Sequence, residues 1–468
     1  MKKILIYIIL AISVVGFTAC EDKLFQSPIT DKSADNFFQT EVEIESAVNG
    51  VYATLQSFNL YGVYIPIIGE IPSDNTFDEV PANDGGRYGQ LDEFTTVTEN
   101  PGITNLWRDS YRGIQRANTV LNRIDEIDFE EESVKNSRVG EMKFIRALLY
   151  FNLVRLYGDV PLVIEETSNP NDFFGQERTP TTGVYTRIIT DLDEAITVLP
   201  ENQSEAGRVT QIAAQSLLGK VHLTLGNYGE ATNHLSAVKA SGKHTLVAIP
   251  ADIFTLETDN IEESIFAVQF ESGLNGNSEG SDLFQQTAPS GTVNGAKGHS
   301  LPTVSLYNLF DQSDLRFDAF LGTTDEGIPF SKKYKEPTTD PRDGGSNYIV
   351  LRYADVLLML AEAQNETGNT QAALENLNTV RNRAGLPNAV ANNQTDIREA
   401  IALERRFELI SEGHRWFDLL RTNQAIPVMN AWFTEQGRSI RIDENDLLMP
   451  IPQSQIDTDP AITQNIGY

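Results

Sequence analysis

Three glutamates spaced four residues apart, Glu404, Glu408 and Glu412, have a residue type and a spacing that suit polysaccharide hydrolysis. On a helix they share one face, and a glycosidase needs an acid and a second carboxylate about 5 to 9 Å apart. Like charges at this spacing repel, and three arginines lie close by in the sequence: Arg405, Arg406 and Arg415. We therefore expect a paired ion network that locks the last helices together, not a catalytic pair.

Residues 276–280 match the G-x-S-x-G nucleophile elbow of α/β-hydrolases, and a possible strand at 264–270 precedes them. The elbow turns directly from strand into helix, whereas residues 271–275 intervene here and no amphipathic helix follows. We interpret the match as chance in a loop rich in Gly, Ser and Asn.

Metal-binding patterns are weak in this chain. Five histidines are scattered, at positions 222, 234, 244, 299 and 414. There is no H-E-x-x-H motif and Cys20 is the single cysteine, so the sequence predicts no metal centre. Two acidic pairs, Asp443 with Asp446 and Asp457 with Asp459, could bind calcium, but they lack EF-hand spacing and fit solvated loops better. We expect no cofactor, with a structural calcium ion as the open alternative.

A long segment, residues 58–103, carries side chains suited to sugar recognition. Proteins bind sugars with flat aromatic faces that cover the apolar side of a pyranose, and with amide, carboxylate or guanidinium groups for its hydroxyls. The segment supplies both kinds of group: Tyr61, Tyr64, Asp74, Asn75, Phe77, Asn83, Asp84, Arg87, Tyr88, Gln90 and Phe94. For each residue, packing within the loop or plain solvation is the alternative to ligand contact.

Further candidates for ligand contact lie in or beside other polar segments: Phe173, Phe174, Phe330, Tyr334 and Trp432. A local basic cluster also stands out in this acidic chain: Lys332, Lys333 and Lys335. Such a cluster could bind uronate or sulfate groups of an anionic polysaccharide, and a solvated turn is the simpler alternative.

The elements that must position these residues are mostly helical, because apolar residues recur three and four apart and few stretches alternate strictly. The expected helices span 41–57, 104–126, 138–157, 183–199, 209–225, 228–240, 350–367, 370–384 and 396–412. Three segments lack this periodicity and are expected to be long functional loops: 58–103, 168–182 and 271–347. The predicted fold class is mainly α, with long irregular loops and minor β structure.

Two of the expected helix pairs match the tetratricopeptide pattern of antiparallel helices joined by a tight turn. Gly226 and Leu235 of the first pair recur 142 residues later as Gly368 and Leu377. Helix pairs of this kind bury their apolar faces only by stacking on neighbours. We therefore expect several divergent pairs to form one curved scaffold.

The amino terminus has the layout of a secretory signal: Lys2 and Lys3, an apolar run over residues 4–17, and small residues before Cys20. The run has fourteen residues, fewer than the roughly 17 to 25 that span a bilayer as a helix. Residues 17–20 resemble a bacterial lipobox, in which the signal is removed before a lipidated cysteine. We expect cleavage of residues 1–19 and a lipid anchor on Cys20.

The composition restricts which partners the chain can bind and which interactions can stabilise its fold. A single cysteine permits no internal disulfide, so an apolar core must hold the fold. The formal net charge of −30 argues against nucleic acid and anionic membrane surfaces as partners.

Several motifs along the mature chain resemble the SusD/RagB family of outer-membrane nutrient-binding lipoproteins. They lie at residues 47–52, 107–111, 116–118, 141–147, 157–162, 351–358, 404–409, 412–421, 450–452 and 464–468. The motifs of the C-terminal half, which end with EGHRWFDLLR at 412–421 in this signature, are the more telling ones. The order of the motifs, more than any one of them, carries the resemblance.

The resemblance implies a SusD-like fold and a non-catalytic protein that binds oligosaccharide at the cell surface. It also implies delivery of the sugar to a TonB-dependent, SusC-like barrel transporter in the outer membrane. Glu21 and Asp22 are similar to the acidic signal that sends such lipoproteins to the outer leaflet. In this family the ligand contacts fall in the region that matches 58–103.

The expected organisation is a cleaved signal at 1–19 and a single domain at 20–468. Within that domain we expect a helical part at about 35–245, a loop-rich part at about 246–347 and the family signature at about 348–468. Three alternatives for function stay open. A RagB-like relative would bind peptides, an anchored glycoside hydrolase would turn over polysaccharide, and a protein-interaction scaffold would bind no small ligand.

Overall fold

The computed structural model describes residues 37–468 except 170, 257–258, 274–278 and 335–338. The predicted signal, Cys20 and the acidic pair beside it therefore lie outside the described residues. The described chain is mainly α, as predicted. In this part of the chain no helix is long and apolar enough to cross a membrane.

The nine predicted helical stretches are confirmed, with their ends shifted by a few residues. They correspond to α3 (Glu41–Leu55), α6 (Pro101–Arg123), α7 (Glu132–Tyr157), α8 (Thr181–Val198), α9 (Gln211–Thr224), α10 (Tyr228–Ser241), α14 (Tyr353–Glu366), α15 (Thr370–Arg383) and α16 (Gln394–Glu408). Side-chain caps fix several starts: Thr40 Oγ1 accepts from the Glu43 amide, and Asn100 Oδ1 accepts from the Gly102 amide beside Pro101.

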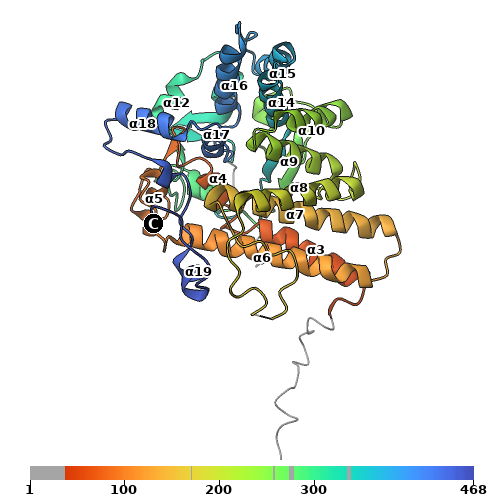
Figure 1. Cartoon of the computed structure of the whole chain (residues 1–468). Helices are drawn as coiled ribbons and strands as arrows, with labels where there is room; N and C mark the ends of the chain where they lie inside the picture. The colour runs from red at the N-terminus through yellow and green to blue at the C-terminus, as the bar shows by residue number, and fades with distance from the viewer. Residues whose placement is uncertain (1–36, 170, 257–258, 274–278, 335–338) are drawn as a thin grey trace, which may run out of the picture.

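The tetratricopeptide-like pairs are present as α9 with α10 and α14 with α15. Gly226 and Gly368, in the turns of the two pairs, have φ angles of 72° and 85°, which L side chains rarely adopt. α10 packs against α14, and α3, α6, α7 and α8 continue the stack toward the N-terminus (Figure 1). The expected stacked scaffold is confirmed.

Two helices form the centre of the molecule. In α7 the residues from Phe144 to Val154 are buried, and so is the run from Ala354 to Ala363 in α14. The largest cluster of buried apolar side chains runs from Ile44 to Ile462, so it draws on all three predicted parts of the domain. Three smaller clusters complete the described core.

The β structure consists of short antiparallel pairs. β2 (Ser264–Val268) pairs with β6 (Tyr348–Arg352), which confirms the predicted strand. β4 (Leu321–Thr323) pairs with β5 (Pro329–Ser331), and β1 (Thr76–Phe77) pairs with β3 (Leu301–Pro302). The last pair joins the predicted loop 58–103 to the predicted loop 271–347.

Short helices fill the remaining segments. They are α4 (Tyr64–Ile68), α5 (Gly89–Asp92), α11 (Leu283–Thr287), α12 (Val304–Leu309), α13 (Leu315–Phe320), α17 (Arg415–Arg421), α18 (Ala425–Glu435) and α19 (Gln453–Thr458). In Figure 1 α12 and α18 lie to the left of α9 and α10, and α17 lies nearer the middle. The segment 58–103 differs from a solvated loop, because every residue from Leu60 to Thr76 is buried.

Candidate functional site

The tyrosines predicted to contact ligand in the first long segment are covered by protein. Tyr61, Tyr64 and Tyr88 are at most 3% exposed. The Tyr64 and Tyr88 ring centroids are 5.7 Å apart, and Tyr88 lies 4.0 Å from the His299 ring. A ring enclosed in this way has no free face for a sugar, so these three side chains act as core residues in this structure.

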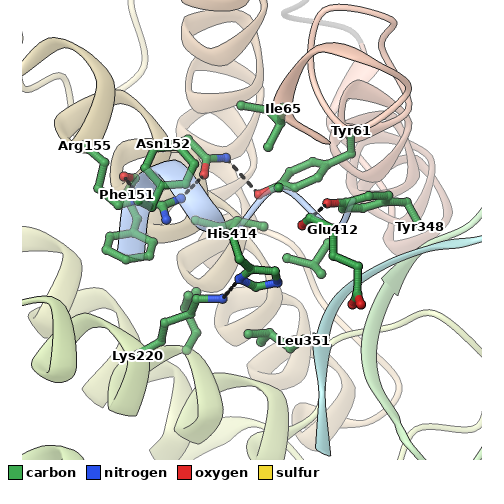
Figure 2. A pocket seen from close by; sticks show the side chains of 15 residues that line it. Tyr61, Ile65, Phe151, Asn152, Arg155, Lys220, Tyr348, Leu351, Glu412 and His414 are labelled. Atoms are coloured by element: carbon green, nitrogen blue, oxygen red, sulfur yellow. Dashed lines mark hydrogen bonds between the residues drawn. The ribbon is translucent and has the colours of Figure 1, made fainter. Parts of the chain in front are cut away.

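Tyr61 lines a small internal cavity beside α7 (Figure 2). Asn152 Nδ2 donates to the Tyr61 hydroxyl at 2.8 Å, and Arg155 Nη2 donates to Asn152 Oδ1 at 2.7 Å. Arg155 itself lies between the rings of Phe151 and Phe417, 3.9 Å from each centroid. The cavity measures about 30 Å³, which suits a water molecule and excludes a sugar.

The same cavity is lined by ionisable groups from α9 and from the C-terminal half. Lys220 Nζ lies 3.2 Å from His414 Nδ1 and 3.0 Å from Asp355 Oδ2. Burial, and then the charge of Lys220, lower the pKa of His414 to about 3, so its ring is neutral at physiological pH. The volume of the cavity, and not the charge of its lining, is what excludes a sugar from it.

Asp74 and Asn75 also serve the scaffold. Arg415 Nε and Arg406 Nη2 each lie 2.8 Å from an Asp74 carboxylate oxygen, and Arg406 Nε donates to Asn75 Oδ1 at 2.5 Å. Burial alone would raise the pKa of Asp74, but the two guanidinium groups outweigh it and lower that pKa. The pair ties the first long segment to α16 and α17.

The other predicted contact residues are spread over separate places. Tyr334 and Trp432 are buried, at 6% and 8% exposure, and Tyr334 stacks on Tyr348. Phe77, Arg87 and Phe330 are partly exposed, on β1, after η1 (Asn83–Gly86) and on β5 respectively. The structure does not bring these five into one site, and ligand contact stays a prediction for the three that reach the surface.

The predicted ion network of Glu404, Glu408 and Glu412 is confirmed, but its expected partners are wrong. Arg352 Nη1 and Arg316 Nη1 lie 2.6 and 2.8 Å from Glu408, and Arg383 also pairs with it. The other partners are Arg316 and Arg381 for Glu404, and Arg352 and Lys333 for Glu412. The partners come from distant segments because the glutamates face the interior.

The three arginines expected in that network have other roles. Arg405 bonds Asp355 and Asp418 at 2.7 and 2.9 Å, while Arg406 and Arg415 bond Asp74. Neighbours along a helix point in different directions, so closeness in sequence did not identify the partners. All three glutamates are buried and ion-paired, which leaves them no access to a polysaccharide.

The basic cluster at 332–335 is not an exposed cationic patch. Lys333 is 1% exposed, lies 2.5 Å from Glu412 and sits 4.0 Å from the Phe320 ring centroid. Lys332 donates to the Asp318 carbonyl, and Lys335 lies outside the described residues. Both expectations for this cluster, a uronate site and a solvated turn, are wrong for Lys333.

Three of the four acids considered for calcium cap turns. Asp443 and Asp446 form a reciprocal capping box, and Asp459 accepts from the Gly175 and Ala461 amides. Among the described residues no three His, Cys, Asp or Glu side chains converge as a metal-binding set. A structural calcium ion stays a prediction. Ser278 of the G-x-S-x-G match lies outside the described residues.

Where the two long loops meet, they form an open groove of about 690 Å³. We call it the loop groove. Its lining combines one aromatic ring with many polar groups: Ala53, Gln56, Ser57, Phe58, Gly62, Glu279, Gly280, Ser281, Asp282, Asp340, Arg342 and Asp343. Phe58 is partly exposed, and the Arg342 side chain is 63% exposed.

Backbone contacts hold the walls of the loop groove together. Ser281 and Gly344 exchange two backbone hydrogen bonds of 2.8 and 2.9 Å, and Ser281 Oγ donates to the Gly62 carbonyl at 2.8 Å. Gly280 must be glycine, because a Cβ there would lie 2.7 Å from the Asp343 Cα. At the far end Gln56 Nε2 donates to Glu279 Oε2 at 2.8 Å.

The loop groove has the chemistry that sugar binding requires. Phe58 supplies a flat apolar face, and Arg342, Asp282 and Gln56 supply donors and acceptors around it. Sequence reasoning located both contributing loops but missed these residues. Phe58 is the first aromatic after α3, so its position at the start of the first loop was a usable signal.

A helical-repeat scaffold that presents a loop-built polar groove defines a binding protein, and comparison with known proteins agrees with this class. The model described as "SusD family" matches residues 320–468, and the one described as "Starch-binding associating with outer membrane" matches residues 30–223. The chain thus resembles the SusD family in both its N-terminal and its C-terminal part.

Relatives match the chain over nearly its whole length. SusD-like protein P2 of Formosa agariphila is 26% identical, with 100% of each chain covered. A SusD-like protein of Bacteroides ovatus is 26% identical over 93% of this chain and 86% of its own.

Two solved structures share the fold at similar identity. A laminarin-binding SusD-like protein has a TM-score of 0.79 at 27% identity, covering 92% of this chain and 100% of its own. A SusD superfamily protein from Parabacteroides distasonis has a TM-score of 0.82 at 26% identity, covering 92% and 99%.

Proposed function

We propose that this protein is a non-catalytic lipoprotein of the outer membrane, held at the cell surface by acyl chains on Cys20. In this proposal it captures oligosaccharide in the loop groove and delivers it to a TonB-dependent, SusC-like transporter. The single observation that carries the binding role is the loop groove itself. There the two loops nominated from sequence meet around one partly exposed aromatic ring and a ring of polar groups.

Two further observations support a binding role over hydrolysis. Glu404, Glu408 and Glu412, which have the spacing of glycosidase carboxylates, are all engaged in buried ion pairs. A relative at 27% identity is named for binding laminarin, a glycan. A carbohydrate ligand is therefore the better-supported choice over a peptide.

The first test is a binding screen of the chain from residue 21 against arrays of glycans and oligopeptides, followed by Phe58→Ala. Loss of the ring should weaken glycan binding at least tenfold, about 1.4 kcal/mol, because stacking on the pyranose face disappears. Titration calorimetry measures the change.

The matched comparison is Phe174→Ala, which removes an exposed ring (60% exposed) from the separate 168–182 loop. This variant should bind as the parent protein does. If Phe174→Ala abolishes binding and Phe58→Ala does not, the site lies on the 168–182 loop and the loop groove is the wrong location. Binding of oligopeptides alone would reverse the choice of ligand class.

Anchoring and delivery need a separate test in cells. We expect Cys20→Ala to release the protein from the membrane fraction, since the acyl chains are its only proposed hold on the bilayer. Co-purification of the tagged parent protein from detergent extracts should recover a TonB-dependent barrel. Retention of the Cys20→Ala variant in the membrane, or recovery without a barrel, would contradict the respective part of the proposal.

A further inference from the structure

We propose that the loop groove selects oligosaccharides that carry no acidic groups, either neutral or amino-substituted, and rejects sulfated and uronate-containing chains. This inference rests on the proposed function, because it assumes that the loop groove is the glycan site. It concerns the chemical class of the ligand, which the family does not fix.

The lining of the loop groove is strongly acidic. Glu279, Asp282, Asp340 and Asp343 contribute four carboxylates, against the one guanidinium of Arg342. Arg342 already lies 3.0 Å from Asp340 through Nη2 and Oδ2, so its charge is shared with a carboxylate of the same wall. The described lining therefore has a formal excess of carboxylates over guanidinium groups.

The acidity continues beyond the loop groove. A neighbouring hollow of about 510 Å³ shares Gln56 and Glu279 with it and adds Asp259 and Glu271 to the lining, with no Lys or Arg among its described residues. A glycan long enough to leave the loop groove on this side meets further carboxylates. Selection against acidic sugars should thus grow with chain length.

Asp282 shows the effect of burial at this wall. Burial raises the pKa of its carboxyl, while Arg342 lowers that pKa by more than Asp340 raises it. A carboxylate or a sulfate of a ligand that is buried against this wall meets the same desolvation cost. Neutral hydroxyls carry no charge to desolvate.

Nearby basic residues do not reverse this charge. Ser57 Oγ donates to Asp109 Oδ2 at 2.6 Å, and Arg108 and Arg112 face the same Asp109 carboxylate at 2.9 and 3.5 Å. Lys333 is buried against Glu412. Lys333 of the predicted lysine cluster is therefore not part of a cationic wall.

The experiment compares laminarin, amylose and xylan in native, sulfated and aminated forms by calorimetry with the chain from residue 21. For the backbone that binds, we expect the sulfated form to bind at least tenfold more weakly than the native form, and the aminated form at least as tightly as the native one. Raising NaCl from 0.1 to 1 M shortens the screening length from about 10 to about 3 Å. The affinities of the sulfated and the aminated forms should therefore both move closer to that of the native form.

The variant that tests the cause is Asp282→Asn with Glu271→Gln. It removes two charges from the acidic walls, and we expect it to raise the ratio of sulfated to native affinity about threefold or more. The control Glu326→Gln removes a glutamate charge from an exposed turn outside the loop groove. It should leave the ratio of sulfated to native affinity unchanged.

The possible outcomes separate the inference from the function beneath it. Equal or tighter binding of sulfated chains, or an unchanged ratio in the double variant, overturns the selection proposed here while leaving glycan binding intact. Failure of every glycan form to bind overturns the proposed function, and the inference falls with it.

Discussion

At the scale of single residues, burial decides what a charged side chain does in this protein. Glu408 is fully buried and faces three arginines, whereas Glu366 meets the half-exposed Arg398 at 2.7 Å. Burial raises the pKa of a carboxyl, but the arginines around Glu408 outweigh this and hold its pKa well below the ordinary value. The network therefore depends on every charge being matched.

We expect Glu408→Gln to destabilise the fold by about 3 kcal/mol or more, because it leaves buried guanidinium groups without their counter-charge. The measurement is urea unfolding followed by circular dichroism. Glu366→Gln, which breaks an exposed pair, should cost less than about 1 kcal/mol. Equal losses in the two variants would mean that the buried network adds no special stability.

The same distinction explains how much of the site could be predicted from sequence. Residue type identified Tyr61, Tyr64 and Tyr88 as suitable for sugars, but type says nothing about exposure, and all three rings are buried. Phe58 was overlooked although it reaches the loop groove. The loops were predictable because their composition differs from that of helices, while the direction of each side chain depends on tertiary packing.

At the scale of elements, the helix pairs pack closely because of small residues at their contacts. A Cβ on Gly219 in α9 would lie 2.6 Å from Leu235 Cγ in α10, so only glycine permits the observed approach. Gly229, at the exposed start of α10, has no atom within 4 Å of the same position. The two glycines are thus a matched pair for testing helix packing.

We expect Gly219→Val to cost about 2 kcal/mol, since the added side chain forces α9 and α10 apart. Gly229→Val should stay within about 0.5 kcal/mol, because Gly and Val differ little in helix propensity at an exposed position. Thermal unfolding of both variants gives the comparison. A stable Gly219→Val protein would show that this helix pair tolerates a wider spacing.

The long helices were predictable because each one repeats an apolar pattern over several turns. The short helices α17 and α18 were missed, since seven and eleven residues offer too few turns for a periodic signal beside the polar residues around them. The end of α16 at Glu408, four residues before the expected end, follows from the turn that carries Ser411 and Gly413 at positive φ. Local backbone geometry of this kind leaves little trace in composition.

At the scale of the whole molecule, the first long segment and the last helices are joined along one seam. The Trp416 amide donates to the Gly69 carbonyl at 2.9 Å, and the His414 amide donates to Glu70 Oε1 at 3.1 Å. Glu70 is 1% exposed, and burial raises its pKa to about 7 despite these hydrogen bonds. A carboxyl that titrates near neutrality thus sits where distant parts of the chain meet.

This position makes the stability of the seam depend on pH. Below about pH 4.5 Glu70 is protonated in both the folded and the unfolded chain and contributes no slope. Between 4.5 and 7 the unfolded chain has released this proton and the folded protein still holds it, so the free energy of unfolding falls as pH rises. Above 7 the folded carboxyl ionises in place and the loss is complete.

We expect Glu70→Gln to gain stability relative to the parent protein by about 1 to 3 kcal/mol as pH rises from 4.5 to 7.5, because the amide keeps the hydrogen bond from His414 and has no proton to lose. Urea unfolding at several pH values measures the difference between the two proteins. Burial also raises the pKa of Asp92 to about 7. Asp92 therefore makes the free energy of unfolding fall with rising pH in both the parent protein and the Glu70→Gln variant. For Glu326→Gln, at an exposed turn, the plot of unfolding free energy against pH should run parallel to that of the parent protein. A parallel plot for Glu70→Gln as well would show that the seam does not titrate in this range.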